Sequence, residues 1–221
     1  MDPWFRYFSS ANARAFAYHG EVLFRSLSYY RDYEDSGVRG DELEGTLQHR
    51  PNTGLIANLK ATGDGVELPC TFESSANEVE IFVYCFSTKL SDDLARRFSA
   101  DVCVEITNPP AFLAKISKAL KLRARFRRSP IVHGPIKYYV PDDPPLGDWA
   151  VPERIALRKP QPFVWQCEYR LAIPKGDAFR AYNVVPKLVP LGAPRPPRSL
   201  AHPELRFKLG SLLSITRTHT L

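Results

Sequence analysis

The run Glu80-Ile81-Phe82-Val83-Tyr84-Cys85-Phe86-Ser87 constrains the fold of this chain more than any other segment. Its interior is an unbroken series of apolar residues, and the β-branched and aromatic side chains among them favour a strand. Because no polar residue interrupts the series, both faces of this strand are expected to be buried. Other helices or strands should therefore pack against both faces of this central strand.

The segments around this run carry alternating strand and helix signals. The chain has 221 residues, of which 44% are apolar, and this is enough for one domain spanning residues 1–221 with a substantial core. We expect an α+β fold of two packed, largely antiparallel sheets with few helices. The expected strands are 4–8, 21–27, 80–87, 102–106, 136–140 and 163–173, and the expected helices are 12–19, ending at Gly20, 94–98, and an amphipathic one from Phe112.

Two long segments lack clear periodicity. Residues 29–78 are polar and rich in Gly, Asp and Glu, so they are expected to form a long loop or an insertion. Residues 186–221 are rich in proline and are expected to wrap around the domain as extended chain.

Cysteine and histidine usage argues against a disulfide framework and a metal centre. Cys70, Cys85, Cys103 and Cys167 are scattered without a C-x-x-C pair, and the five histidines show no metal-ligand spacing. The N-terminal residues lack a basic n-region, and no stretch approaches the roughly 20 apolar residues that cross a bilayer. We therefore expect a cytoplasmic protein that binds neither a metal nor a membrane.

Charge is distributed unevenly along the chain. Residues 1–105 contain ten Lys or Arg against seventeen Asp or Glu, whereas residues 106–221 contain twenty against seven, and the whole chain carries +6. This asymmetry indicates either a polyanionic partner, RNA or DNA, or neutralisation of one half by the other. The candidate nucleic-acid-binding residues are Lys115, Lys118, Lys121, Arg123, Arg125, Arg127 and Arg128.

Three short segments carry residues that could take part in catalysis or ligand binding. Arg6 lies in the first expected strand, Ser87-Thr88 ends the central strand, and Gln166-Cys167-Glu168 lies in a late strand. Because side chains alternate along a strand, Gln166 and Glu168 are expected on one face. A carboxylate there would stabilise the oxocarbenium-like transition state of N-glycosidic bond cleavage. The alternative is a surface Glu168 that pairs with Arg170 or a loop arginine.

Taken together, the three segments resemble the Arg–Ser–Glu signature of ADP-ribosyltransferases, a family in which a split pair of antiparallel sheets grips NAD. A second resemblance connects the chain to a bacterial family of unknown function that closes with a Lys, a Trp and a Glu-aromatic-Arg segment. The matching segments are 22–35, 85–87 and 159–170. An ADP-ribosyltransferase-like fold is expected of that family too.

The resemblance implies a role for each site residue, with NAD as the co-substrate. Arg6 would bind the pyrophosphate or the adenosine ribose, although Arg25 competes for this role. Glu168 would bind the ribose 2′-hydroxyl and stabilise the cation, and Gln166 would orient the acceptor. The remaining donor-site residues are Tyr7, Ser87 and Thr88, with Phe86 or an aromatic of the 29–33 segment, such as Tyr33, stacking on nicotinamide.

A Gln at the first position of the Gln-x-Glu pair implies an acceptor other than arginine. RNA, DNA or another protein side chain then becomes the expected target, and a toxin or phage-defence effector with a neutralising antitoxin fits this chemistry. Three other readings stay open. They are a non-catalytic nucleic-acid-binding module, a metal-dependent nuclease built on Asp101, Glu105 and Glu168, and a structural or toxin-neutralising partner protein.

Overall fold

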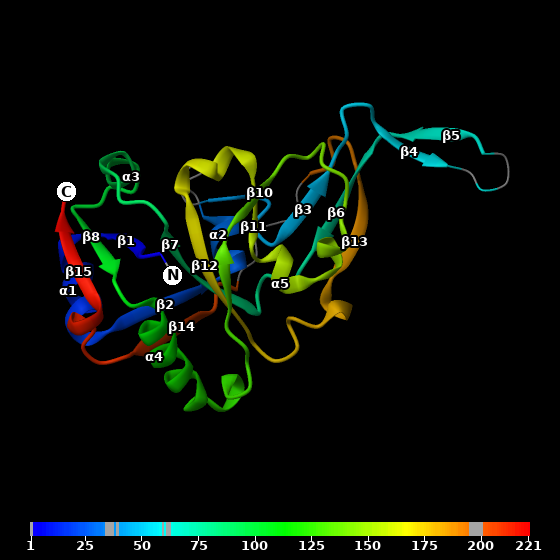
Figure 1. Ribbon diagram of the computed structural model, residues 1–221. Coiled ribbons are helices and arrows are strands. Elements are labelled where there is room, and N and C mark those ends of the chain that lie inside the picture. Colours follow the sequence, from blue (N-terminus) through cyan, green and yellow to red (C-terminus); the bar gives the residue numbers. More distant parts are fainter. Residues whose placement is uncertain (1, 34–37, 39, 59, 61–62, 195–200) are drawn as a thin grey trace.

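The computed structural model describes residues 2–33, 38, 40–58, 60, 63–194 and 201–221, and its fold is α+β. Figure 1 shows the arrangement of the elements. The helices are α1 (Ser10–His19), α2 (Leu27–Asp32), α3 (Asp92–Arg97), α4 (Pro109–Lys121) and α5 (Pro152–Ile155), with 3₁₀ turns η1 (Ala124–Phe126), η2 (Gly147–Ala150), η3 (Gln161–Gln166), η4 (Ala181–Asn183) and η5 (Leu213–Ile215). The strands are β1 (Trp4–Phe8), β2 (Glu21–Ser26), β3 (Thr46–His49), β4 (Leu55–Asn58), β5 (Gly65–Leu68), β6 (Cys70–Ser75), β7 (Ile81–Ser87), β8 (Val102–Ile106), β9 (Val132–Pro135), β10 (Lys137–Tyr139), β11 (Arg158–Pro160), β12 (Glu168–Pro174), β13 (Val185–Pro190), β14 (Glu204–Lys208) and β15 (Thr216–Thr220).

Strand β7 lies at the centre of the main sheet, as the apolar run predicts. The strand order is β14-β2-β7-β1-β8-β15, while β12 pairs with β7 and β9 pairs with β12. Every neighbouring pair in this sheet is antiparallel, and the sheet curls into a half-barrel. Every residue of β7 except Cys85 is buried, which confirms the expectation that both faces are covered.

The two faces of β7 pack against different layers. Phe82, Tyr84 and Phe86 belong to a core that includes Phe16 of α1 and Phe112 of α4. Ile81 and Val83 point the other way, into a second core that includes Leu47 of β3, Trp149 and Ile155. The second face is therefore covered by the three-stranded sheet β13-β6-β3 together with η2 and α5, so the predicted pair of packed sheets is confirmed.

Local sequence signals account for the two longest helices. Helix α1 ends at Gly20, whose φ of 63° lies in the left-handed region as the sequence predicts. A Cβ at this position would lie 2.3 Å from the Gly210 carbonyl oxygen, so only glycine fits. Helix α4 begins after Asn108, whose side chain accepts a hydrogen bond from Ala111 N at 3.1 Å. No helix among the described residues combines the length and apolar character needed to cross a membrane.

The prediction of a long loop over residues 29–78 is wrong for much of that segment. It contains β3 and β6 of the second sheet and the two-stranded β4–β5 sheet, which projects from the body in Figure 1. These strands are short, and β4 and β5 contain no buried residue. Their sequences therefore lack a clear alternation of apolar and polar residues.

The C-terminal segment 186–221 also differs from the expected wrap. Within its described part, β13, β14 and β15 pair with β6, β2 and β8 respectively. Pro186 and Pro190 are tolerated because β13 is an edge strand, where an absent backbone donor costs little.

Candidate functional site

A split in the main sheet creates the candidate site. Strand β12 pairs with β7 along its whole length. On its other edge β7 meets β1 only where Phe5 faces Ser87, and it meets β2 only at Val83 and Phe82. Between these contacts β1 and β2 diverge, so Tyr84 to Phe86 have no strand partner on that edge. A cavity of about 990 Å³ lies there, near the upper end of the ~300–1,000 Å³ typical of ligand sites.

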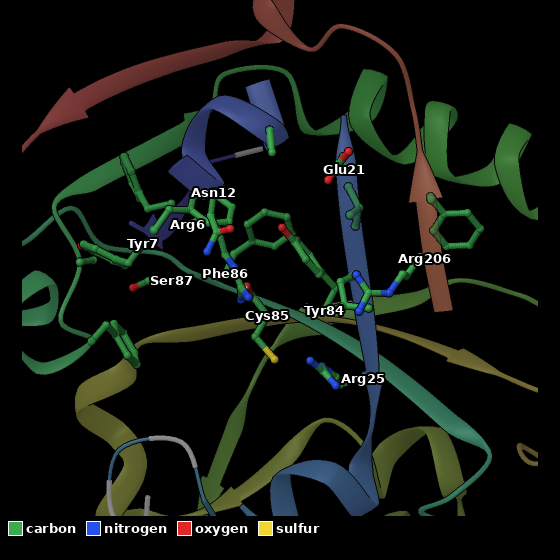
Figure 2. Close-up of a pocket in the computed structure, with 18 of the residues that line it drawn as sticks. Arg6, Tyr7, Asn12, Glu21, Arg25, Tyr84, Cys85, Phe86, Ser87 and Arg206 are labelled. Atoms are coloured by element: carbon green, nitrogen blue, oxygen red, sulfur yellow. The ribbon is translucent and has the colours of Figure 1, made fainter. Parts of the chain in front are cut away.

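The cavity brings together the three segments singled out in the sequence. Arg6 reaches it from β1 and Ser87 from the end of β7, as Figure 2 shows. Glu168 lines the same cavity from the start of β12. The register explains this convergence, because Ser87 is paired with Phe5 on one side and with Glu168 on the other. The cavity is also lined by Tyr7, Arg25, Tyr29, Tyr30, Tyr84, Cys85, Phe86, Leu122, Arg123, Lys159, Gln166 and Arg206. Thr88 and Tyr33, both expected in the donor site, do not line it.

The side chain of Arg6 extends into the split and does not form a salt bridge with any described residue. Its Nη1 donates to the carbonyl of Cys85, and its guanidinium lies over the Tyr84 ring at 4.6 Å from the centroid. Its Nε is buried without a hydrogen-bond partner, and no ion pair involves Arg6 in the described part of the chain. An unpartnered donor on a charged group is costly, so this site favours an anionic ligand.

Arg25, the competing arginine, already has a carboxylate partner. It forms an ion pair with Glu204 and lies over the Tyr29 ring at 4.3 Å from the centroid. Glu204 also binds Arg206 at 2.7 Å, so the two arginines share one carboxylate at the edge of the cavity. Of the two candidates, Arg6 has the greater capacity for a further anion.

Glu168 is a buried carboxylate between two cations. Its Oε1 accepts from Arg170 Nε at 2.8 Å, and its Oε2 lies 2.8 Å from Lys159 Nζ. The side chain is 5% exposed. Burial alone raises the pKa of Glu168, but Arg170 and Lys159 outweigh it and hold the pKa well below its ordinary value. Glu168 is therefore ionised at neutral pH. The sequence alternative is confirmed in that Glu168 pairs with Arg170, and it is wrong in placing Glu168 on the surface.

The two cations extend the charge cluster to a residue that the sequence did not single out. Arg170, which is 1% exposed, donates from Nη1 and Nη2 to Glu44 at 2.6 and 3.1 Å. Its Nη1 also donates to the Ala156 carbonyl at 2.8 Å. Lys159 Nζ lies 3.8 Å from Glu44. Glu44 lies in a polar segment with several acidic residues, and the local sequence does not distinguish it from them. Only the fold shows that Glu44 belongs to the charge cluster.

The strand expected over residues 163–173 is wrong for its first part, which includes Gln166. Residues Gln161–Gln166 form η3, and Cys167 adopts a left-handed conformation with φ 45° and ψ 48°, so β12 begins at Glu168. Alternation along a strand therefore does not relate Gln166 to Glu168. The Gln166 amide accepts from Lys159 at 2.9 Å and donates to the Val38 carbonyl at 2.8 Å. Its polar atoms are thus bound within the protein, and an acceptor-orienting role does not fit them.

Hydrogen bonds fix the rim of the cavity around Ser87. Ser87 Oγ donates to the Gln166 carbonyl at 3.0 Å, and Thr88 Oγ1 donates to the Cys167 carbonyl at 3.2 Å. The Tyr7 hydroxyl donates to the Lys89 carbonyl at 2.8 Å. Phe86 packs in the core with Trp4, at 5.2 Å between ring centroids. These residues hold the loop after β7 in place, and Ser87 remains at the cavity wall.

The nuclease reading requires Glu105 and Glu168 to share an ion. Phe5 pairs with Glu105, Ser87 pairs with Phe5, and Glu168 pairs with Ser87, so three strand spacings separate the two glutamates. At ~4.8 Å per spacing the separation is about 14 Å, too far for one metal ion. Glu105 instead binds His219 at 2.8 Å. The described residues contain no cluster of potential metal ligands.

The predicted basic residues lie on α4 and in the segment that follows it. Lys118 and Lys121 are exposed on α4, Lys115 is half-buried, and Arg125, Arg127 and Arg128 are exposed in and after η1. Among these seven candidates only Arg123 lines the cavity.

Asp41, near this charge cluster, makes the stability of the protein depend on pH. Its Oδ2 is buried without a hydrogen-bond partner. Burial and the neighbouring Glu44 raise the pKa of Asp41 to about 7. The folded state then holds a proton that the unfolded state releases near pH 4, so stability falls as pH rises between these values. Beyond about pH 7 this contribution levels off.

We expect Asp41→Asn to remove this decline. Between pH 5 and pH 8 the wild type should lose about 2 kcal/mol more unfolding free energy than the variant does, because one pKa unit corresponds to ~1.4 kcal/mol. Urea unfolding of both proteins at each pH measures the difference. Parallel pH profiles for the two proteins would contradict this assignment.

The protein has an α+β fold, and a cavity lies in the split of its curled antiparallel sheet. Comparison of the chain with protein-family models, with curated proteins and with solved structures finds no match.

Proposed function

We propose that this protein is an NAD-dependent ADP-ribosyltransferase. It would cleave the nicotinamide–ribose bond of NAD and transfer ADP-ribose to an acceptor. One observation carries the proposal: Arg6, Ser87 and Glu168 lie on three adjacent strands and line one cavity. These are the three positions at which the sequence resembles the ADP-ribosyltransferase signature.

The cavity has the chemistry that a dinucleotide requires. Arg6 offers an unpartnered buried donor for the pyrophosphate, where a guanidinium binds phosphate in a bidentate manner. Tyr29, Tyr30 and Tyr84 add aromatic surface to the lining, which suits nicotinamide and adenine rings. The volume of about 990 Å³ accommodates a ligand of this size.

Glu168 supplies the electrostatic stabilisation. When the C1′–N bond breaks, its electron pair leaves with nicotinamide and the ribose becomes an oxocarbenium ion. The ionised Glu168 accepts a hydrogen bond from the ribose 2′-hydroxyl and faces the developing positive charge. The acceptor nucleophile then bonds to C1′ and releases its proton to solvent. Lys159 and Arg170 are positioning residues, since they hold both oxygens of Glu168.

Nicotinamide release from NAD is the direct test, and a comparison of Arg6→Gln with Arg25→Gln sharpens it. We expect Arg6→Gln to raise KM for NAD about 10- to 100-fold, because a charge-assisted hydrogen bond is worth ~1.5–3 kcal/mol. Arg25→Gln should change KM by less than about threefold, because Arg25 is already paired with Glu204. Steady-state kinetics measure both values.

Two outcomes would contradict the proposal. The absence of nicotinamide release by the wild type, with and without added acceptors, would exclude the enzyme function. An effect of Arg25→Gln larger than that of Arg6→Gln would reassign the phosphate site to Arg25.

A further inference from the structure

The end of α4 and the residues after it form an exposed cationic surface. We call the following six residues the basic surface: Lys118, Lys121, Arg123, Arg125, Arg127 and Arg128. None of them forms an ion pair with any described residue, and residues 106–141 include no Asp or Glu. Some other exposed cations are paired, as Arg97 is with Asp93 and Lys208 with Glu21. A concentration of unpaired charge on a folded surface costs stability unless a polyanion compensates it.

The basic surface is fixed to the core rather than carried on a free loop. Phe126, in the middle of the arginines, is buried and packs edge-on against Phe82 at 5.6 Å between centroids. Arg123 Nη2 donates to the Arg206 carbonyl at 3.1 Å, and Ser129 Oγ donates to the Pro174 carbonyl at 2.7 Å. The backbone that carries these cations is therefore held in place before any partner binds, which lowers the entropic cost of binding.

The basic surface begins at the cavity. Leu122 and Arg123 line the same cavity as Arg6 and Glu168, and the Leu122 side chain is 81% exposed. Helix α4 packs beside β14, which forms the far wall through Arg206 (Figures 1 and 2). A chain bound along the basic surface would therefore reach the cavity at Leu122 and Arg123.

We propose that the basic surface binds the phosphodiester backbone of a single-stranded nucleic acid and presents it to the cavity as the ADP-ribose acceptor. The acceptor role rests on the proposed transferase function, whereas the binding surface does not. A single strand is required because a nucleobase must leave its stack to enter a cavity. RNA and DNA share the phosphodiester chemistry, and separate arms of the test distinguish them.

Binding is tested with the triple variant Lys118→Gln/Lys121→Gln/Arg125→Gln, none of whose residues lines the cavity. Fluorescence anisotropy of labelled single-stranded RNA and DNA oligonucleotides gives Kd at several salt concentrations. We expect wild-type affinity to fall steeply with salt. The triple variant should weaken binding at least about tenfold and reduce the slope of log K against log salt by about 2, since each phosphate contact contributes ~0.7.

The matched control removes three charges elsewhere. Arg50, Arg154 and Arg180 are exposed and form no ion pair among the described residues. The variant Arg50→Gln/Arg154→Gln/Arg180→Gln should bind oligonucleotides within about twofold of the wild type, because these charges lie outside the basic surface. Unchanged thermal unfolding of both triple variants establishes that they are folded, as expected for exposed positions.

Transfer is measured with NAD labelled in its adenylate moiety. Label should appear on RNA or DNA with the wild type and the control variant, and at least about tenfold less with the basic-surface variant. Equal oligonucleotide affinity of the two triple variants would overturn the binding surface. Binding to phosphatidylserine vesicles but not to oligonucleotides would replace it with a membrane surface. Intact salt-dependent oligonucleotide binding without nicotinamide release would overturn the transferase function and the acceptor role, while supporting the surface itself.

Discussion

Glu168→Gln is expected to reduce nicotinamide release from NAD by at least about 100-fold. The substitution keeps the shape of the side chain but removes the negative charge that would face the oxocarbenium ion. Removal of one preorganised electrostatic group from an active site costs ~10²–10³ in kcat. The effect should appear in kcat more than in KM, because the charge matters most in the transition state.

The matched control is Glu44→Gln. Glu44 belongs to the same buried charge cluster and binds the same Arg170, but it does not line the cavity. Any general disturbance of the cluster should therefore affect both variants, whereas direct stabilisation of the ribose cation is lost only with Glu168→Gln. We expect the loss of kcat in Glu44→Gln to be at least about tenfold smaller. Equal losses in the two variants would mean that Glu168 acts through the cluster and does not contact the substrate.

Arg170→Met is expected to lower the unfolding free energy by about 3–5 kcal/mol. Arg170 is 1% exposed and lies between two buried carboxylates, Glu44 and Glu168. Without it, Lys159 remains as the one ion-pair partner of both glutamates among the described residues. Breaking a buried pair leaves an uncompensated charge in the interior, and this accounts for the magnitude. Chemical denaturation monitored by fluorescence measures the change.

Two comparisons separate the loss of charge from the loss of packing. Arg158→Met removes an ion pair with Asp148 that is partly exposed, so it should cost no more than about 1 kcal/mol. Adding Glu44→Gln to Arg170→Met should recover part of the lost stability, because one of the two stranded carboxylates becomes neutral. A cost for Arg170→Met no greater than that of Arg158→Met would show that the cluster contributes little to the fold.

The position of Arg170 also explains how the second sheet reaches the candidate site. Glu44 precedes β3 of the small sheet, whereas Arg170 and Glu168 lie on β12 of the main sheet. The ion pair therefore joins the two sheets directly beside the cavity. Its loss should disturb the orientation of Glu168 as well as the stability of the fold.

Several features follow from the sequence because their causes are local. The apolar run of β7 identifies a strand buried on both faces, and Gly20 marks the end of α1. The spacing of Phe112, Ile116 and Leu120 identifies the buried face of α4, and Lys118 and Lys121 are exposed as expected, whereas Lys115 is half-buried. Each of these inferences depends only on residues that are close together in the sequence, within one helix or one strand.

The tertiary structure decided the rest, because the responsible contacts join residues far apart in the chain. Glu44 and Arg170 are separated by 126 positions, and the local sequence of a polar segment does not reveal such a partner. The strand expected at Gln166 fails for a related reason: hydrogen bonds to Lys159 and Val38 hold its side chain, and the chain turns at Cys167 before β12 begins. The sequence thus determined the central strand β7 and the residue types of the site. Only the divergence of β1 and β2 from β7 determined that Arg6 and Glu168 line one cavity.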